Sequence, residues 1–239
     1  MEAYDINYLF LLYLYPEKKK EKTLWDIYEV GPGEGRRPNL ASEFTGQVAA
    51  KLAMGFVPDG WGNLETTFGP EDVFHYMYAV FHSPAYRVRY AEFLKIDFPR
   101  LPLTGQPELF RKLCRLGREL TGLHLLESHP TRLTHFPLAG TNMVEIVRYT
   151  PPGQPNEKDP GRVWINSLQY FEGVLPDVWE FQVGGYQVCQ KWLKDRKGRA
   201  LSYDDIQHYH SIVAALSETI RLKAEIDTII EDAGGWPLT

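Results

Sequence analysis

The stretch SYDDIQHYHSIVAALSETIRLKAEIDTIIED, residues 202–232, predicts one long helix near the end of the chain. Ser202 is a favourable helix cap, and the acidic residues after it lie where the helix dipole stabilises negative charge. An apolar stripe recurs along it at helical spacing and consists of Ile206, Tyr209, Val213, Leu216 and Ile220. We therefore expect a long amphipathic helix.

Four earlier segments also have helical patterns: 42–54, 69–83, 83–95 and 106–127. Pro70 and Pro84 stand at first helical positions, where the missing N–H group costs nothing, and Ser83 is the expected N-cap of the third segment. The first segment has a core-facing stripe of Phe44, Val48 and Leu52. Before these helices, the apolar run YLFLLYLY (8–15) predicts a buried strand.

The pattern changes after residue 127. NMVEIVRYT (142–150) and GRVWINSLQYFEGV (161–174) are strand-like, and the loop PPGQPNEKDPG (151–161) separates them. The predicted fold class is α+β, rich in helix, with a small central and mainly antiparallel sheet and a long C-terminal helix. We expect an N-terminal helical part with one buried strand (1–127) and a strand-containing part with a basic helix and the long helix (128–239), together forming one compact module.

Composition narrows the class of protein. The net charge of −5 argues against a chain that coats nucleic acid indiscriminately, although a local basic face remains compatible with DNA binding. Two cysteines, far apart in sequence, favour neither a disulfide framework nor a zinc knuckle, so we expect a cytoplasmic protein with reduced thiols. The apolar run 8–15 is too short to span a bilayer and lacks the flanks of a signal peptide, so no membrane association is expected.

The segment GGYQVCQKWLKDRKGR (184–199) concentrates positive charge, with five cations in the nine residues that end at Arg199. On a helical wheel one side is apolar and carries Tyr186, Cys189, Trp192 and Leu193, and the other side is polar and carries Gln187, Gln190, Lys191 and Lys194. The residues after them should form a helix end or turn. The two glycines would allow a close backbone approach at the start of the helix, where N–H groups favour anions.

These residues form a candidate DNA-binding site. Cationic side chains hold phosphates, and glutamine amides pair with adenine edges. The predicted phosphate contacts are Lys191, Lys194, Arg196, Lys197 and Arg199. Gln187 and Gln190 are candidates for base edges, as are Asn166, Gln169 and Tyr170 in the strand-turn region. The alternative is a solvated charged face, because the helix dipole alone favours cations near a helix C-terminus.

Other patterns point to no catalytic or metal site. His208 and His210 are two residues apart on a helix and diverge, and His75 and His82 have no further ligand at suitable spacing, so we interpret them as structural and predict no metal site. SPAY (83–86) is similar to the loop with which amino-methyltransferases hold a flipped base, but alanine replaces its second proline and helices flank it. No nucleophile–base pattern is present.

Two long segments, 44–103 and 161–209, resemble the C-terminal specificity region of Type ISP restriction–modification enzymes, and the similarity extends from about Tyr8 to GGWP near the end of the chain. Those bacterial enzymes join a nuclease, a helicase-like translocase, an adenine-N6 DNA methyltransferase and a target recognition domain in one chain. Their catalytic motifs are missing here. The resemblance therefore implies a target recognition domain that is not itself an enzyme.

The resemblance also implies partners and cofactors. The partners would be double-stranded DNA and the methyltransferase domain of the parent enzyme, with no cofactor in this chain and S-adenosylmethionine and ATP acting only in the parent. The lack of a heptad seam favours a monomer. Two alternatives stay open: a protein–protein docking scaffold within the same enzyme, and a degenerate DNA methyltransferase fragment that uses SPAY.

Overall fold

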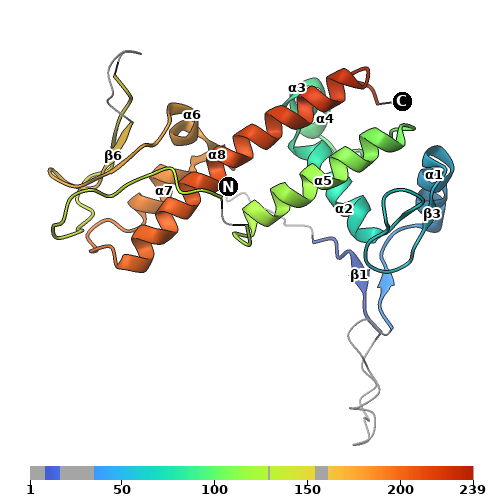
Figure 1. Ribbon diagram of the computed structural model, residues 1–239, viewed down its shortest axis with the longest axis horizontal. Coiled ribbons are helices and arrows are strands. Elements are labelled where there is room, and N and C mark those ends of the chain that lie inside the picture. Colours follow the sequence, from blue (N-terminus) through green and yellow to red (C-terminus); the bar gives the residue numbers. More distant parts are fainter. Residues whose placement is uncertain (1–8, 17–34, 129, 154–160, 239) are drawn as a thin grey trace, which may run out of the picture. The chain divides into compact units, whose positions relative to one another are not determined.

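The computed structural model describes residues 9–16, 35–128, 130–153 and 161–238 (Figure 1). Helices predominate, the sheets are small, and a thirty-residue helix runs close to the C-terminus, which confirms the predicted α+β class. Internal contacts divide the chain into unit 1, residues 1–118 with 226–239, and unit 2, residues 119–225. In the described ranges, no helix is both long enough and apolar enough to cross a membrane.

Unit 1 contains most of the predicted N-terminal helices. Its elements are β1 (Tyr13–Leu14), β2 (Arg37–Pro38), α1 (Ser42–Leu52), β3 (Gly55–Phe56), β4 (Thr67–Phe68), α2 (Pro70–His82), α3 (Pro84–Arg89), α4 (Ala91–Leu94) and parts of α5 (Pro107–His124) and α8 (Tyr203–Asp232). The β1–β2 pair is antiparallel and the β3–β4 pair is parallel. As predicted, Pro70 and Pro84 start their helices.

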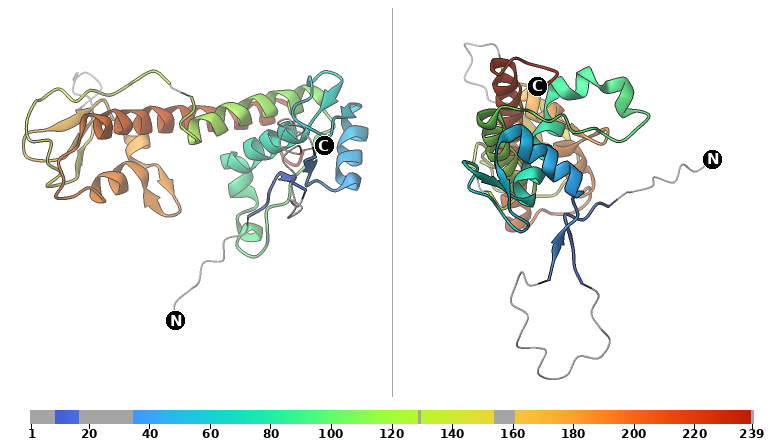
Figure 2. Two further views of the ribbon diagram at one scale, coloured as in Figure 1. Left: turned by 90° about the horizontal axis from the view of Figure 1, so that it is seen from below. Right: turned by 90° about the vertical axis from the view of Figure 1, so that its right-hand side faces the viewer.

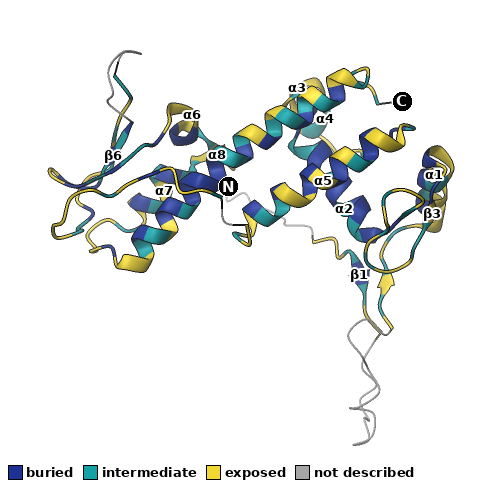
Figure 3. Ribbon diagram, viewed as in Figure 1, coloured by how far each residue is buried: buried dark blue, intermediate teal, exposed yellow. Residues whose placement is uncertain are grey.

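Aromatic side chains fill the core of unit 1. Tyr76 on α2 and Phe110 on α5 are buried with ring centroids 5.0 Å apart, and Phe110 also meets Phe68 of β4 at 6.0 Å. The Tyr76 hydroxyl donates a 2.7 Å hydrogen bond to the Pro102 carbonyl. The apolar faces of α2 and α5 thus meet; α5 also has an exposed polar side, whereas every residue of α2 is buried or half-buried, as Figure 3 shows.

A buried hydroxyl joins the α2–α3 corner to the end of α8. Ser83 is fully buried, and its Oγ accepts a 3.0 Å hydrogen bond from the Tyr86 N–H, which confirms it as the N-cap of α3. The same hydroxyl donates to Asp227, whose other carboxylate oxygen accepts from the Ala85 N–H at 3.0 Å. Because one carboxylate satisfies two donors at a helix start, this corner is fixed to α8 within unit 1.

The N-terminal apolar run departs from its prediction. Only Tyr13 is buried, while Leu9, Phe10, Leu11 and Tyr15 are largely exposed, and Tyr8 lies outside the described residues. The expectation of a buried strand is therefore wrong for most of residues 9–15: only Tyr13–Leu14 form a strand, and of these Tyr13 alone is buried. Among the described residues, β1 is two residues long and pairs with β2 alone, so its neighbours are left exposed.

Unit 2 is built on a three-stranded antiparallel sheet. Its order is β5 (Arg148–Thr150), β6 (Arg162–Trp164) and β7 (Tyr170–Glu172), followed along the chain by α6 (Pro176–Glu180), β8 (Gln182–Val183), β9 (Tyr186–Gln187) and α7 (Val188–Lys194). Residues 154–160 of the predicted loop lie outside the described ranges. The two predicted strand regions thus pair with each other, as expected.

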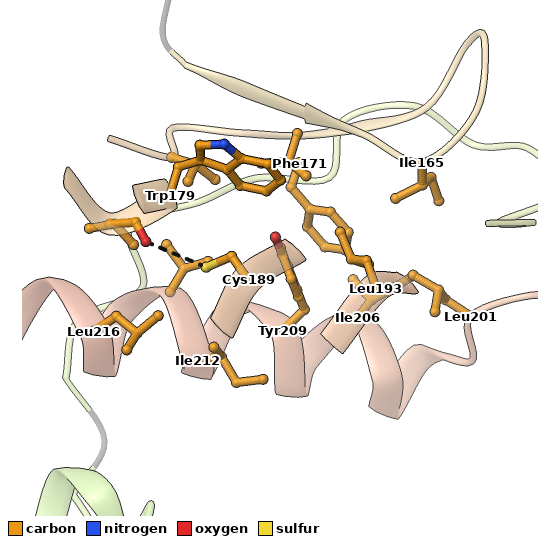
Figure 4. Close-up of a cluster of buried hydrophobic side chains, with 14 of the residues drawn as sticks. Ile165, Phe171, Trp179, Cys189, Leu193, Leu201, Ile206, Tyr209, Ile212 and Leu216 are labelled. Atoms are coloured by element: carbon orange, nitrogen blue, oxygen red, sulfur yellow. Dashed lines mark hydrogen bonds between the residues drawn. The ribbon is translucent and has the colours of Figure 1, made fainter. Parts of the chain in front are cut away.

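One buried cluster holds the sheet, α7 and α8 together (Figure 4). Val163 and Phe171 on the inner face of the sheet meet the stripe of α8, where Tyr209 lies with its ring centroid 4.3 Å from that of Phe171. Cys189 and Leu193 of α7 complete the cluster and are fully buried. The stripe predicted for residues 206–220 is thereby confirmed as the core face of α8.

His210 on α8 is buried in a polar contact beside this core. Its Nε2 accepts a 2.5 Å hydrogen bond from the Arg132 guanidinium, so Nδ1 carries the proton and donates to Thr134 Oγ1 at 2.6 Å. Burial, assisted by the Arg132 charge, lowers the pKa of His210 to about 4. The imidazole is therefore neutral at physiological pH and serves as a structural acceptor.

Replacing Ser83 by alanine should lower the free energy of unfolding by about 1–2 kcal/mol, because it removes the N-cap of α3 and a donor to Asp227. Urea denaturation followed by circular dichroism measures the change. Ser42→Ala, at the exposed start of α1, is the matched control and should shift stability by less than about 0.5 kcal/mol. Equal effects of the two substitutions would contradict the role of Ser83.

The lowered pKa of His210 predicts a pH dependence of stability. The unfolded chain takes up a proton on this residue near pH 6.5 and the folded chain only near pH 4, so its contribution is complete above pH 6.5 and is lost as pH falls toward 4. Urea unfolding near pH 7 and pH 5 should therefore show a smaller pH effect for His210→Gln than for wild type. The exposed neighbour His208, changed to Gln, should retain the wild-type pH effect.

Candidate nucleic-acid interface

The two glycines of the basic segment form the turn of a hairpin. Gly184 and Gly185 have φ values of 57° and 82°, the left-handed pair that a tight two-residue turn requires. They join β8 to β9, which pair Gln182 with Gln187 and Val183 with Tyr186. The expectation that the glycines lie at a helix start is wrong, because α7 begins only at Val188.

Tyr186 also departs from its prediction. It belongs to β9 rather than to the helix and is 63% exposed, so it is not a core residue. The helical wheel holds for the residues within α7: Cys189 and Leu193 are buried, and Gln190, Lys191 and Lys194 lie on the polar side. The structure thus brings the predicted lysines together on one exposed helix face.

Both lysines have exposed partners on the same helix. Lys191 forms a 2.6 Å ion pair with Asp195, and Lys194 donates a 2.8 Å hydrogen bond to Gln190. Ion pairs between exposed side chains contribute only about 0–1 kcal/mol, so a phosphate can replace these partners at small cost. Both ammonium groups therefore remain available to an anion.

Arg196 has a different environment, because its guanidinium is held by contacts within unit 2. It lies 3.5 Å from the centroid of the Trp192 ring, donates to the Trp192 carbonyl at 3.1 Å, and contacts Asp205 of α8 at 3.3 Å. Its side chain is only 24% exposed. Asp205 in turn accepts from the backbone and side chain of Ser202, which lower its pKa together with Arg196.

The turn after α7 presents two further cations. Arg199 is 60% exposed and lies 3.9 Å from Asp205, a weak contact. Lys197 is exposed and forms no ion pair with any described residue. We call the exposed cations Lys191, Lys194, Lys197 and Arg199 the basic surface.

Asn166 and Gln169 lie inside the fold. Asn166 Oδ1 accepts from the Leu168 and Gln169 N–H groups at 2.9 and 2.7 Å and so shapes the turn between β6 and β7. Gln169 accepts from the Asn142 N–H at 2.7 Å and donates to the Leu138 carbonyl at 3.0 Å. Both are buried, so a base contact would require these hydrogen bonds to break.

Tyr170 lies on the outer face of the sheet among residues that the sequence analysis missed. Its ring centroid is 4.6 Å from that of Trp164, the Arg162 guanidinium lies 4.9 Å from the Tyr170 ring, and Arg148 lies 5.2 Å from the Trp164 ring. The signal for this face is the alternation in RYT, RVW and YFE, where every second residue points away from the core. Cation–aromatic contacts of this kind hold guanidinium groups in place.

The sequence matches the family model of the Type ISP C-terminal specificity domain over residues 1–225. The chain belongs to this family. A search of curated proteins finds no match.

Two solved structures share the fold of the specificity domain. The DrdV–DNA complex matches with a TM-score of 0.58 and 21% identity over 90% of this chain and 21% of that one. The ATP-dependent Type ISP restriction–modification enzyme LlaBIII bound to DNA matches with a TM-score of 0.58 and 18% identity, over 90% of this chain and 13% of that one. The specificity domain thus spans about a fifth or less of the length of either protein.

The remaining sequence candidates are placed in structural roles. In SPAY, Ser83 caps α3, and Tyr86 is buried with its hydroxyl bonded to the Arg100 carbonyl at 2.8 Å. His75 is buried against Trp61, with ring centroids 4.8 Å apart. Among the described residues of the specificity domain, no three His, Cys, Asp or Glu side chains form a group that could hold a metal ion.

Arg196→Ala should lower the free energy of unfolding by about 1–2 kcal/mol, because it removes the contact with Trp192 and the ion pair with Asp205. Urea denaturation of the specificity domain measures this loss. Lys197→Ala, the exposed neighbour, is the control and should leave stability within about 0.5 kcal/mol of wild type. A loss of the same size in both variants would show that Arg196 does not stabilise the turn.

Proposed function

We propose that this specificity domain recognises the DNA target of a Type ISP restriction–modification enzyme and holds the duplex while other domains methylate adenine and cut the DNA. The observation that carries the proposal is the basic surface. Four exposed cations lie on α7 and its turn, in a segment that contains one acid between residues 191 and 199. The family match supports the same function.

The local charge explains how an acidic chain would bind DNA. Lys191 and Lys194 lie three residues apart on one helix face, where both can reach phosphates of a duplex. A phosphate can take the place of Asp195 or Gln190 as the partner of a lysine. A weak exposed contact is then exchanged for one that also releases counterions from DNA. The negative charge elsewhere would oppose binding in other orientations.

The roles of the predicted site residues follow from their placement. In this proposal Lys191, Lys194, Lys197 and Arg199 contact phosphates, and Arg196 shapes the turn that presents them. Gln187 and Gln190, next to the lysines, are the base-edge candidates. Asn166 and Gln169 support the β6–β7 turn from within, and Tyr170 lies on a separate aromatic face.

The wider assignments belong to the same proposal. The specificity domain would act as a monomer in the cytoplasm, without catalytic activity or a cofactor of its own. S-adenosylmethionine and ATP would act in other domains of the parent enzyme. The family match supports this division of labour, since it describes a specificity domain rather than a catalytic one.

A second role is favoured by exposed apolar side chains in unit 1. Leu9, Phe10 and Leu11 are exposed, and the Phe10 ring contacts that of Phe98 with centroids 5.7 Å apart. We propose that this surface docks against the methyltransferase domain of the parent enzyme, because apolar surface of this kind is typical of protein contacts. Phe10→Asp should weaken association with that domain in a pull-down and leave DNA binding by the specificity domain unchanged.

The double variant Lys191→Ala, Lys194→Ala should weaken binding to a mixed-sequence duplex and reduce the slope of log affinity against log salt by about two units, because two phosphate contacts are lost. Fluorescence anisotropy over a range of salt concentrations measures both quantities. The matched control is Lys95→Ala, Lys112→Ala, two exposed lysines that also have acidic partners. Wild-type affinity and slope in the first variant would exclude the basic surface as the DNA contact.

A further inference from the structure

The β8–β9 hairpin exposes apolar side chains where the fold gives them no partner layer. Val183 and Tyr186 are cross-strand partners and are 62% and 63% exposed. Gln182 and Gln187 form the neighbouring pair and therefore point to the opposite face of the ribbon. In the left view of Figure 2 the hairpin, in orange, extends away from α7.

The tip of the hairpin is narrow. A Cβ atom on Gly184 or Gly185 would meet no atom within 4 Å, so both glycines border open space. Core packing therefore does not explain the two glycines, whereas the left-handed turn does. The result is a slender two-stranded ribbon with one amide face and one apolar face.

The surroundings of the ribbon suit a polyanion. From residue 181 to residue 194 the chain contains no carboxylate, and its only charges are Lys191 and Lys194. Lys191 Nζ lies 5.9 Å from the centre of the Tyr186 ring, so the apolar face of the ribbon and the basic surface adjoin each other. A partner that meets the ribbon also meets these cations.

We propose that the β8–β9 hairpin inserts into the major groove of DNA and reads A·T base pairs, an inference that rests on the proposed function. The major groove, about 12 Å wide, admits a two-stranded ribbon, whose strands are about 4.8 Å apart. Lys191 and Lys194 hold the phosphates that flank the groove, and this contact sets the depth of insertion.

The side chains of the ribbon match the chemistry of A·T pairs. The exposed amide of Gln182 donates to adenine N7 and accepts from the adenine N6 amino group, a bidentate pair that no other base offers in the same pattern. In this proposal the ribbon enters the groove edge-on, so that Val183, on the opposite face, contacts the thymine C5-methyl group of a neighbouring pair. The hairpin therefore supplies the sequence selection, and the basic surface supplies binding strength that depends little on sequence.

The test begins with selection of duplexes from a pool with a randomised centre by the wild-type chain, followed by sequencing. Wild type should enrich a motif that contains A·T pairs. Gln182→Ala should lose the preference at one or two of these pairs and bind the enriched duplex roughly 5- to 100-fold more weakly, with unchanged affinity for a mixed-sequence duplex. Lys191→Ala, Lys194→Ala should instead weaken both duplexes alike and retain the motif.

A second measurement isolates Val183. Replacing thymine by uracil in the enriched duplex removes the methyl group and should weaken binding by wild type but not further weaken binding by Val183→Ala. Leu168→Ala, an exposed apolar residue in the same unit, is the control and should respond to uracil as wild type does.

The outcomes separate the two proposals. An enriched motif that survives both Gln182→Ala and Val183→Ala overturns the hairpin inference and leaves DNA recognition standing. If Gln182→Ala loses the preference only at G·C pairs, the hairpin inference is overturned as well. Absence of any DNA binding or enrichment by wild type overturns the proposed function and the inference together.

Discussion

The burial of one face of α7 is the constraint on which the candidate interface depends. Cys189 and Leu193 are fully enclosed in the cluster formed by the sheet and α8. A seven-residue helix has few hydrogen bonds of its own and is stabilised mainly by packing, so this burial also fixes its rotation. The ammonium groups of Lys191 and Lys194 must then lie on the outside, whatever their own interactions contribute.

The cations of the basic segment divide into two kinds according to solvent exposure. Arg196 is half-enclosed between Trp192 and Asp205, where its charge stabilises the turn into α8. Lys191 and Arg199 reach carboxylates too, but from exposed positions where water screens the attraction. A phosphate backbone can compete with the second kind of contact and not readily with the first, and this difference defines the surface proposed to meet DNA.

Polar residues of the same chemical type have opposite roles in unit 2 because of where the backbone turns. Asn166 and Gln169 follow β6 and point back into the sheet, where their amides satisfy backbone groups that would otherwise be unpaired. Gln182 and Gln187 pair across a short two-stranded ribbon, where Gln182 is exposed and Gln187 half-buried. The inward amides stabilise the turn, and the exposed amide of Gln182 is accessible to a ligand.

The sequence by itself determined the α+β class, the long C-terminal helix with its stripe, the caps at Ser83 and Ser202, and the gathering of cations between residues 191 and 199, since these depend on local periodicity and charge. It also carried the family resemblance. It could not determine that Gly184 and Gly185 turn a hairpin, that residues 9–11 stay exposed, or that Asn166 and Gln169 point inward. Those features depend on which segments distant in sequence pair or cover one another, because burial is a property of neighbours in space, and only the tertiary structure decided them.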